Sequence, residues 1–349
     1  MLLINILVLV TGLILLVKGS DYFVKSASSI AKSLGVSEFV IGLTLVAVGT
    51  SIPELASCVA ASLAQSSGIV IGNIVGSNIA NIALIVGCAA ILSVVKTDTE
   101  MLKRDGYIMM FAAILFLVLA FDLQLSKIEA VILILFYVAY VLFLFEDKSK
   151  YEGKFYFKEY IDYFFRFKYV KSINQRVKNG INNRSSGKKQ SNEIAANGIS
   201  RDVLILVFSG IAVIIGARYF IEEAIFFAEL FQVPDTFIGI TLVAVGTSLP
   251  ELMVTISAAR KGYGNIAIGN VIGSNITNIF LILGISALIF PLEITRISLS
   301  LTIPFMIFIT AVLLWFINTH WEIRKIEGIA LIFLYVIFLI LLFTLNIPS

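Results

Sequence analysis

The segment that decides the fold is Gly42–Leu55, GLTLVAVGTSIPEL, an apolar run that ends beside a carboxylate. It is repeated at Gly239–Leu252 as GITLVAVGTSLPEL. A second pair of segments follows at the same distance, Gly72–Asn81 (GNIVGSNIAN) and Gly269–Asn278 (GNVIGSNITN). The offset between the copies is 197 residues in both pairs and contains no gap. A constant offset of this kind indicates an internal duplication.

The composition places the chain in a membrane. Of its 349 residues, 59% are hydrophobic and only 14% are charged, with a mean hydropathy of +0.98. Soluble domains carry about 25% charged residues, so this inventory cannot cover a protein with a water-facing surface. The N-terminal residues 1–23 lack a basic start and a small-residue cleavage site, and we interpret them as a membrane helix rather than a signal peptide.

Hydropathy predicts ten membrane-spanning helices, because each span needs about 20 mostly apolar residues. The predicted spans are Leu2–Ile30, Ser37–Ala64, Gly68–Val95, Tyr107–Leu123, Lys127–Phe145, Asp202–Leu230, Pro234–Ala259, Asn265–Phe290, Ser298–Asn318 and Ile326–Leu345. They form two sets of five. Since five is odd, the second set enters the membrane from the opposite side, as in many secondary transporters.

The predicted fold is therefore an all-α membrane protein with ten transmembrane helices, arranged as two inverted five-helix repeats with broken helices at a midplane ion site. The first repeat is expected over 1–145 and the second over 202–349, with a loop at 146–201 between them.

Loop charges predict the orientation through the positive-inside rule. The segment Glu146–Asp202 holds half of the Lys and Arg residues and is expected to be cytoplasmic, which places both termini outside the cell. Its aromatic and basic first part, Tyr151–Val170, is interpreted either as an interfacial amphipathic helix that touches anionic lipid or as a solvated linker.

Two carboxylates lie near the middle of predicted spans. An ionised Glu at this depth is costly and indicates a functional site. The alternative, a Glu that reaches an interface or stays protonated, fits poorly because Glu54 lies about halfway along its apolar segment. Glu251 repeats the same setting.

Prolines precede both carboxylates. Pro53 and Pro250 lack an N–H and crowd the carbonyl four residues earlier. We therefore expect the carbonyls of Ala47–Thr50 and Ala244–Thr247 to leave the helical ladder and to need partners inside the membrane. An ordinary proline kink satisfied by Ser or Thr is the alternative. Free oxygens beside a carboxylate suit a dehydrated cation.

Helical spacing collects polar side chains around the carboxylates, because residues three or four apart share a face. The residues grouped in this way are Thr50, Ser51 and Glu54; Asn73, Ser77 and Asn81; Thr247, Ser248 and Glu251; and Asn270, Ser274 and Asn278. Close helix packing with interhelical hydrogen bonds is the alternative role for such positions. That alternative stays open for Asn73, Asn78, Asn270 and Asn275, and packing is the role we assign to Gly72, Gly76, Gly269 and Gly273.

All these candidate ligands are hard oxygens, which favour calcium or sodium over softer metals. Two carboxylates in a low-dielectric environment repel each other strongly. The site is therefore expected to be unstable when empty and to hold one divalent ion, several monovalent ions or protons. Mutually exclusive occupancy of this kind is the physical basis of antiport.

The motifs GTSIPE and GTSLPE, together with GSNIAN and GSNITN, resemble the two alpha repeats of the sodium/calcium exchangers in the cation/calcium exchanger superfamily. The resemblance covers nearly the whole chain outside the central loop. It implies exchange of several sodium ions for one calcium ion, without a prosthetic group. The implied calcium site uses Glu54, Glu251, the Thr50 and Thr247 carbonyls, Asn81 and Asn278; the implied sodium sites use Ser51, Ser77, Ser248, Ser274 and the Ala47 and Ala244 carbonyls.

Two features depart from parts of that family. Asn278 stands where some microbial members and the potassium-dependent branch have Asp, which argues against potassium co-transport. The loop at 146–201 is too short for the calcium-sensing β-sandwich pair of animal exchangers.

For transport, we expect the first and sixth helices to slide across the other eight and expose the site to one side at a time.

Several rival functions are weighed against sodium/calcium exchange. The nearest is a calcium/proton antiporter, although protons need no shell of Ser ligands. A calcium channel would conduct without a counter-ion, and a receptor or scaffold gives no reason for paired midplane carboxylates. An enzyme is disfavoured because no nucleophile–base pair or nucleotide loop is found.

The expected partners are calcium, sodium and the lipid bilayer, with no nucleic acid and with a monomer as the expected state.

Overall fold

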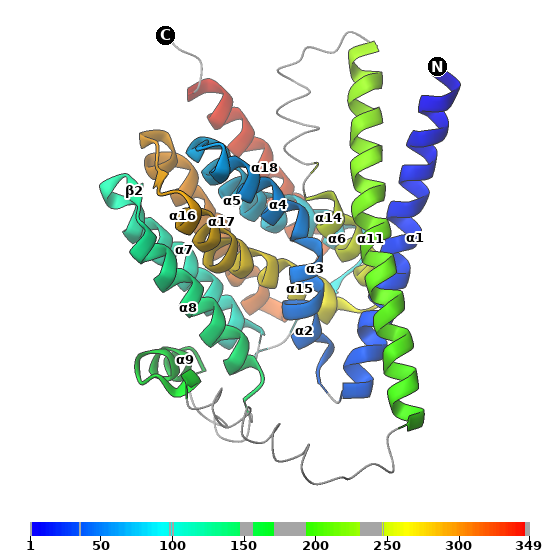
Figure 1. Ribbon diagram of the computed structural model, residues 1–349, viewed down its shortest axis with the longest axis horizontal. Coiled ribbons are helices and arrows are strands. Elements are labelled where there is room, and N and C mark those ends of the chain that lie inside the picture. The colour runs from blue at the N-terminus through cyan, green and yellow to red at the C-terminus, as the bar shows by residue number, and fades with distance from the viewer. Residues whose placement is uncertain are drawn as a thin grey trace.

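The computed structural model describes residues 2–34, 36–97, 99, 101–146, 156–170, 193–230, 246 and 248–345, and these are nearly all helical (Figure 1). The helices before the central loop are α1 (Leu2–Leu34), α2 (Glu38–Ile41), α3 (Ala47–Thr50), α4 (Ile52–Leu63), α5 (Ser67–Ala80), α6 (Val86–Leu92), α7 (Tyr107–Leu119) and α8 (Lys127–Leu144). The loop contributes α9 (Tyr156–Phe165). The later helices are α11 (Glu193–Leu230), α14 (Leu249–Arg260), α15 (Gly264–Thr277), α16 (Leu283–Ile289), α17 (Ile303–His320) and α18 (Lys325–Leu345).

Short π-helical turns and two-residue strands complete the described elements. The π-helical turns are η1 (Gly42–Val46), η2 (Asn81–Ile85), η3 (Met101–Gly106), η7 (Asn278–Ile282) and η8 (Ser298–Thr302), and η4 (Ala120–Asp122) is a 3-10 turn. The strands are β1 (Val95–Lys96), β2 (Gln124–Leu125), β3 (Leu292–Glu293) and β4 (Glu322–Ile323).

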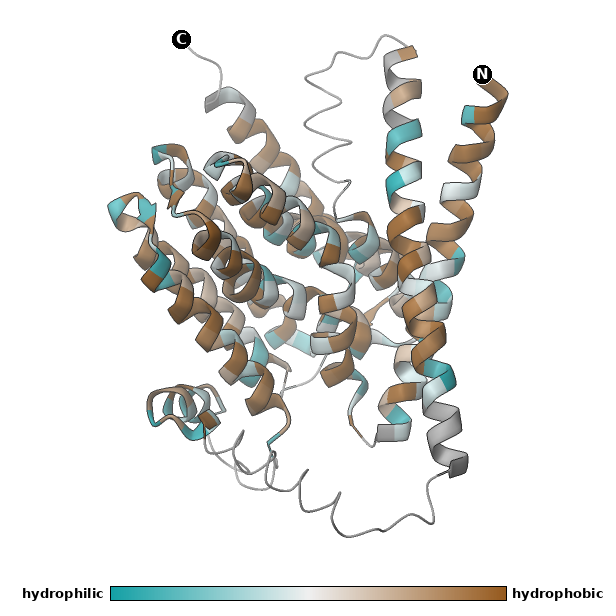
Figure 2. Cartoon of the chain, in the orientation of Figure 1, coloured by the Kyte–Doolittle hydropathy of each residue, from teal (hydrophilic) through white to brown (hydrophobic). Residues whose placement is uncertain are grey.

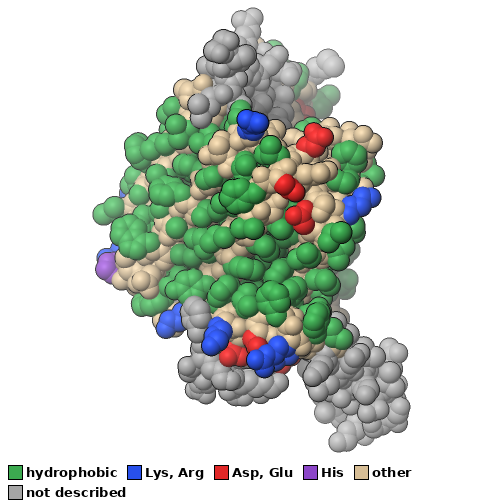
Figure 3. Space-filling view, turned by 90° about the vertical axis from the view of Figure 1, so that its left-hand side faces the viewer, with side chains coloured by type: hydrophobic (Ala, Val, Ile, Leu, Met, Phe, Trp, Pro, Cys, Tyr) green, Lys and Arg blue, Asp and Glu red, His purple; other side chains and the backbone are tan. Residues whose placement is uncertain are grey.

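The described helices form a multi-pass membrane protein. Eight of them are long and apolar enough to cross a membrane, and a ninth span is the pair Glu38–Thr50 and Ile52–Leu63, bent by 47°. The predicted span Pro234–Ala259 is described continuously only from Ser248 onward, so the described residues account for nine of the ten expected spans. Apolar residues line the outer helices, and one face shows a broad hydrophobic belt between charged groups at its two ends (Figures 2 and 3).

The pairing of α1 with α11 shows that the repeats are inverted. In Figure 1, α1 runs down from the N-terminus while its repeat mate α11 runs up beside it. Gly12 lies against Gly216 and Phe220, whereas Gly19 lies against Ser209 and Val213, so the two helices are antiparallel. A Cβ on Gly216 would come within 2.8 Å of the Gly12 carbonyl oxygen. Glycine at this crossing lets the two backbones approach closely, as in other membrane helix pairs.

The rest of the two repeats is interlocked through equivalent contacts. Strand β1 pairs with β4 and β2 pairs with β3, in both cases antiparallel and between repeats. Helix α6 packs on α18, where Gly87 meets the backbone of Gly328. Its mate α16 packs on α8, where Gly284 meets Ala130. Because each repeat is covered by helices of the other, the core belongs to both.

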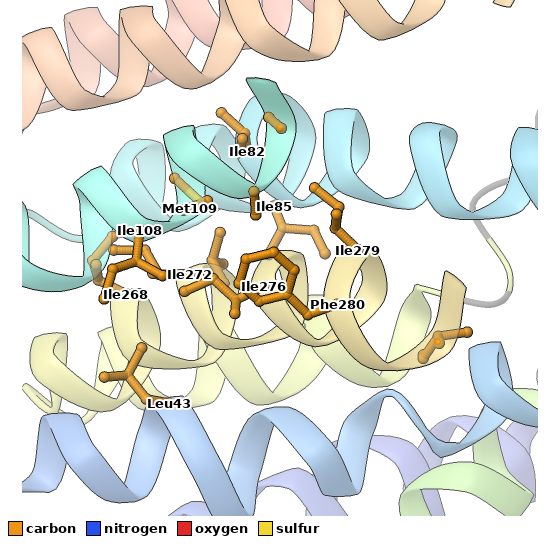
Figure 4. Close-up of a cluster of buried hydrophobic side chains, with 14 of the residues drawn as sticks. Leu43, Ile82, Ile85, Ile108, Met109, Ile268, Ile272, Ile276, Ile279 and Phe280 are labelled. Atoms are coloured by element: carbon orange, nitrogen blue, oxygen red, sulfur yellow. The ribbon is translucent and has the colours of Figure 1, made fainter. Parts of the chain in front are cut away.

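Buried apolar side chains pack between helices of the two repeats (Figure 4). Ile82 on η2, Ile276 on α15 and Phe280 on η7 are fully buried there. Ile108 and Met109 of α7 reach the same cluster. The first residues of η2 and η7, Asn81 and Asn278, are residues of the candidate site.

Helix α9 is present within the predicted amphipathic segment, and its inner face packs on protein. Tyr160 is fully buried and donates a hydrogen bond to the Phe136 carbonyl at 3.0 Å. The Phe164 ring stacks on the Phe136 ring at 3.8 Å between centroids. Phe165 on the other side is 65% exposed. The contact of α9 with anionic lipid stays a prediction. Helix α11 begins at Glu193, so the second helical block starts inside the predicted loop.

Candidate ion-binding site

The second span breaks at Ser51, immediately before the first carboxylate. Ser51 has φ −84° and ψ 9°, and the helix bends by 47° between α3 and α4. Helix α4 starts at Ile52, with Pro53 in a first-turn position where its missing N–H costs nothing. Glu54 therefore lies in the first turn, where the helix dipole favours negative charge.

The second repeat builds the same start. Ser248 has φ −91° and ψ 8°, and Pro250 and Glu251 occupy the first turn of α14. Both carboxylates are buried: Glu54 is 2% exposed and Glu251 is 1% exposed. The predicted pair of buried midplane acids is thus carried by two helix N-termini, one from each repeat.

The helix break at Ser51 releases fewer backbone carbonyls than the sequence predicts. The Ala47 carbonyl was expected to leave the helical ladder, yet it accepts the Ser51 N–H at 3.0 Å and lies 3.3 Å from the Thr50 hydroxyl. It stays in the ladder because the chain turns out of the helix only at Ser51. Pro53 has no N–H to donate to the Gly49 carbonyl four residues earlier. Ala244 and Thr247, the predicted counterparts of Ala47 and Thr50, lie outside the described residues.

Serines link each carboxylate to the opposite repeat. The Ser51 hydroxyl donates to Glu251 Oε1 at 3.1 Å, and the Ser248 hydroxyl donates to Glu54 Oε1 at 3.4 Å. Two further serines extend these contacts: Ser274 Oγ lies 3.1 Å from Ser51 Oγ, and Ser77 Oγ lies 3.3 Å from Ser248 Oγ. All four predicted serines are therefore gathered around the two carboxylates.

The two predicted amide ligands start π-helical turns. Asn81 begins η2 and Asn278 begins η7, the repeat-related position. Asn81 Nδ2 donates to Asn275 Oδ1 at 3.0 Å, and Asn278 Nδ2 donates to Asn78 Oδ1 at 2.9 Å. Turns of this type are frequent at functional sites. With each NH2 group engaged, the carbonyl end of each amide points elsewhere.

Four buried oxygens at this place have no hydrogen-bond partner within the described structure. They are Glu54 Oε2, Glu251 Oε2, Asn81 Oδ1 and Asn278 Oδ1. They form two pairs related by the duplication, and every one of them is an acceptor. Buried acceptors without a donor are costly. A hard cation is the kind of ligand that satisfies acceptors of this type.

Thr50 also reaches across to the second repeat. Its hydroxyl donates to Asn270 Oδ1 at 3.1 Å, and Asn270 Nδ2 donates to Thr255 Oγ1 at 3.0 Å. The repeat mate of Asn270 is Asn73, which is half-buried and accepts from Ser77 at 3.2 Å. The Asn270 amide therefore has the interhelical bonding role that the sequence left open.

A small pocket lies beside this site on the side of α1 and α11. Phe23, Gly49, Thr50, Gly210 and Pro250 are among its lining residues. The Phe23 ring lies against both glycines: an added Cβ would be 3.3 Å from the ring at Gly49 and 3.1 Å from it at Gly210. The Phe23 ring of α1 therefore lies between Gly210 of α11 and Gly49 of the broken span.

Sequence reasoning missed two features of the site. The π-helical turns at Asn81 and Asn278 leave no trace in the hydrophobic periodicity. The second feature is the set of contacts that Asn78 and Asn275 make with the opposite repeat. One sequence signal pointed to these two residues, because both recur within the duplicated GSN motif. Their role was left open because spacing alone does not say which helix a side chain meets.

Comparison with known proteins now adds to this geometry. The family model described as sodium/calcium exchanger protein matches residues 4–146 and again residues 202–344. The chain belongs to the sodium/calcium exchanger family.

Individual proteins are similar to most of the chain. The chain is 62% identical to "Sodium/calcium exchanger MaX1" of Methanosarcina acetivorans, over 98% of this chain and 99% of that protein. It is 32% identical to the inner membrane protein YrbG of Escherichia coli, over 81% of this chain and 80% of that one. A solved structure of the sodium-calcium exchanger NCX_Mj has a TM-score of 0.74 at 31% identity, covering 97% of this chain and 98% of that chain.

Proposed function

We propose that this member of the sodium/calcium exchanger family is a secondary antiporter that exchanges sodium for calcium by alternating access. The observation that carries the proposal is the set of four unpartnered oxygens from Glu54, Glu251, Asn81 and Asn278. Two carboxylates and two amide oxygens, buried inside a membrane bundle, form a hard and negatively charged site.

Calcium fits this donor set best. It takes six to eight oxygens in adaptable geometry, and its two charges match the two carboxylates. The Glu54 and Glu251 carboxylates would provide the charge, and Asn81 and Asn278 would complete the central position. The Thr50 and Thr247 carbonyls are the remaining proposed ligands, of which Thr50 is described at the end of α3.

Sodium fits the flanking serines. Ser51 and Ser274 form one hydroxyl pair and Ser248 and Ser77 form the other, each beside a carboxylate oxygen. We propose that sodium ions bind at these pairs, with the Ala47 carbonyl and its undescribed mate Ala244 as further ligands. Ala47 uses one side of its oxygen for the helix, and a carbonyl has a second lone pair for a cation. Because these sites share the carboxylates with calcium, sodium and calcium would exclude each other.

The packing of α1 and α11 supports the sliding mechanism. The two helices pack along much of their length, and each approaches the other's backbone at glycines. Among the described side chains, α1 contacts the rest of the bundle through a few polar bonds, such as those of Asp21 to Ser257 and Lys261. A tightly joined pair with few polar ties to the core can move as one body.

The orientation in the cell follows from the charges. The start of α1 and the end of α18 lie at one end of the bundle and α9 lies at the other (Figure 1). We propose that the end with α9 and the basic loop faces the cytoplasm and that both termini face outward.

A flux assay with two separate gradients tests this function. Purified protein in calcium-loaded liposomes should release calcium when sodium is imposed outside, and it should release little when only a pH gradient is imposed. Release driven by protons alone would contradict sodium coupling and support the calcium/proton alternative. Calcium movement that continues without any counter-ion would indicate a channel. Crosslinking α1 to α14 should stop exchange, and unchanged exchange after crosslinking would contradict the sliding mechanism.

A further inference from the structure

Two asparagines at the centre of the bundle, Asn78 and Asn275, contact the opposite repeat in a crossed arrangement. Asn78 belongs to α5 and Asn275 to α15, and each is 1% exposed. Asn78 Oδ1 accepts from Asn278 Nδ2, and Asn275 Oδ1 accepts from Asn81 Nδ2. Each asparagine therefore holds the proposed cation ligand of the other repeat.

The same two residues are also tied to each other's backbone. Asn78 Nδ2 donates to the Asn275 carbonyl at 3.5 Å, and Asn275 Nδ2 donates to the Asn78 carbonyl at 3.4 Å. Their amide nitrogens lie near thioethers, with Met306 Sδ at 3.5 Å and Met109 Sδ at 3.6 Å. These bonds use the donor end of each amide and direct its oxygen toward the neighbouring ligand.

We propose that Asn78 and Asn275 are positioning residues that choose which end of the Asn278 and Asn81 amides faces the cation. This inference rests on the proposed function. An amide has an acceptor oxygen and a donor NH2 of similar shape, and only the oxygen can bind a cation. A carboxylate ligand needs no such choice, because both of its ends are oxygens. The crossed pair is the device that lets two neutral amides serve in a cation site.

The consequence is a specific dependence between residues. Without Asn78, nothing among its described contacts holds the Asn278 NH2 away from the site, and the amide can rotate and present its NH2 group to the ion. Loss of a partner that orients a metal ligand lowers metal affinity by roughly 10–100-fold. Asn275→Ala should cause the same loss through Asn81.

The test measures calcium binding to the purified full-length protein by isothermal titration calorimetry in sodium-free detergent buffer. Asn78→Ala should weaken calcium binding by about 10–100-fold. In an Asn278→Asp background, the same Asn78→Ala change should alter the affinity less than about threefold, because the Asp ligand has no NH2 end to exclude. Asn275→Ala in that Asn278→Asp background should keep its full effect, since it acts through Asn81.

Ser62→Ala is the matched control. Ser62 is also buried and bonds across the repeats, to the Ser286 carbonyl at 3.1 Å, yet it is no part of the site. Its removal should leave calcium affinity unchanged. If Asn78→Ala does not yield a monodisperse protein, the milder Asn78→Ser and the symmetric Asn275→Ala test the same dependence.

Two outcomes would overturn the proposal. One is an unchanged calcium affinity in Asn78→Ala. The other is an equal loss in the native and Asn278→Asp backgrounds, which would make Asn78 a packing residue only. Because the readout is binding, a chain that binds calcium without exchanging it for sodium would contradict the proposed function and leave this test intact.

Discussion

The two repeats carry nearly the same residues at the ion site but differ in what packs around them. Gly269 and Gly273 of α15 lie against the backbone of the first repeat: a Cβ on Gly273 would be 2.5 Å from the Leu43 carbonyl oxygen. Their mates Gly72 and Gly76 on α5 have no described atom within 4 Å of an added Cβ. The segment that would mirror η1, residues 239–243, lies outside the described residues. Packing is the predicted role of all four glycines, and the described contacts show it for the two glycines of α15.

The α15 glycines let the broken span of the first repeat approach the helix backbone closely. Because the motifs GNIVGSNIAN and GNVIGSNITN are nearly the same, changes at paired positions of the two repeats test how far the halves are equivalent.

Replacing either carboxylate should affect transport equally if the repeats share one site. Glu54→Gln and Glu251→Gln should each reduce calcium exchange by more than the roughly 10–100-fold that follows loss of an outer partner, because each removes a charged ligand. Radioactive calcium flux in liposomes measures the effect. Monodisperse elution in detergent is the control for folding. Retained exchange in one variant would remove that residue from the calcium site.

Alanine at the glycine pairs should separate the two faces. Gly273→Ala should lower the free energy of unfolding by about 1–3 kcal/mol, because its Cβ would overlap the Leu43 carbonyl. Gly76→Ala, whose added Cβ meets no described atom within 4 Å, should change thermal stability less. Thermal denaturation in detergent checks both. An equal loss of stability in Gly76→Ala and Gly273→Ala would contradict a packing difference between the two helices.

The repeat-related serines Ser77 and Ser274 should distinguish sodium binding from calcium binding. Ser274→Ala and Ser77→Ala should each raise the sodium concentration needed for half-maximal exchange several-fold. They should change calcium binding less, because the proposed sodium sites use these hydroxyls and the proposed calcium site depends on the carboxylates. Ser274 is fully buried and 3.1 Å from Ser51 Oγ, while Ser77 also bonds to Asn73. We therefore expect Ser274→Ala to have the larger effect. An unchanged sodium response in both would exclude the hydroxyls from the sodium sites.

The smallest effect is expected at the ion pairs of α1 and α11. Lys261, the residue after α14, pairs with Asp21 of α1 at 2.7 Å, whereas Arg218, the repeat mate of Asp21, pairs with Glu222 on its own helix. Part-exposed ion pairs contribute about 0.2–1 kcal/mol. Lys261→Gln should therefore change turnover by up to about fivefold, and Arg218→Gln should leave it nearly unchanged. Flux under saturating calcium measures both, and equal effects would contradict a tie specific to α1.

Much of the fold could be predicted because its signals are local. The length of each apolar segment predicts the spans. The odd number of spans in each repeat predicts the inversion, which the antiparallel pair α1 and α11 shows. Helix ends were less accurate: α11 begins at Glu193 rather than Asp202, since polar composition does not prevent a helix from extending beyond the membrane. The paired strands between repeats were not predicted, because two residues carry no periodicity.

The membership of the site stays a prediction of the sequence, and its connections come from the structure alone. Helical spacing places Glu54, Ser51 and Thr50 on one face, and all three are buried. Their partners, however, belong to the second repeat: Ser51 donates to Glu251 and not to its neighbour Glu54. Spacing predicts which residues share a helix face, and it contains no information about the face that the other repeat presents.

The sequence by itself determined that this chain is a duplicated membrane protein with a carboxylate, amides and hydroxyls at the middle of each half. Those properties follow from hydropathy, from residue spacing and from the cost of placing charge in hydrocarbon. Only the tertiary structure decided that serines cross between the repeats, that Asn78 and Asn275 orient the opposite amides, and that η1 covers the α15 face. These contacts depend on how two inverted halves dock, which is a property of three-dimensional packing and leaves no periodic signal along the chain.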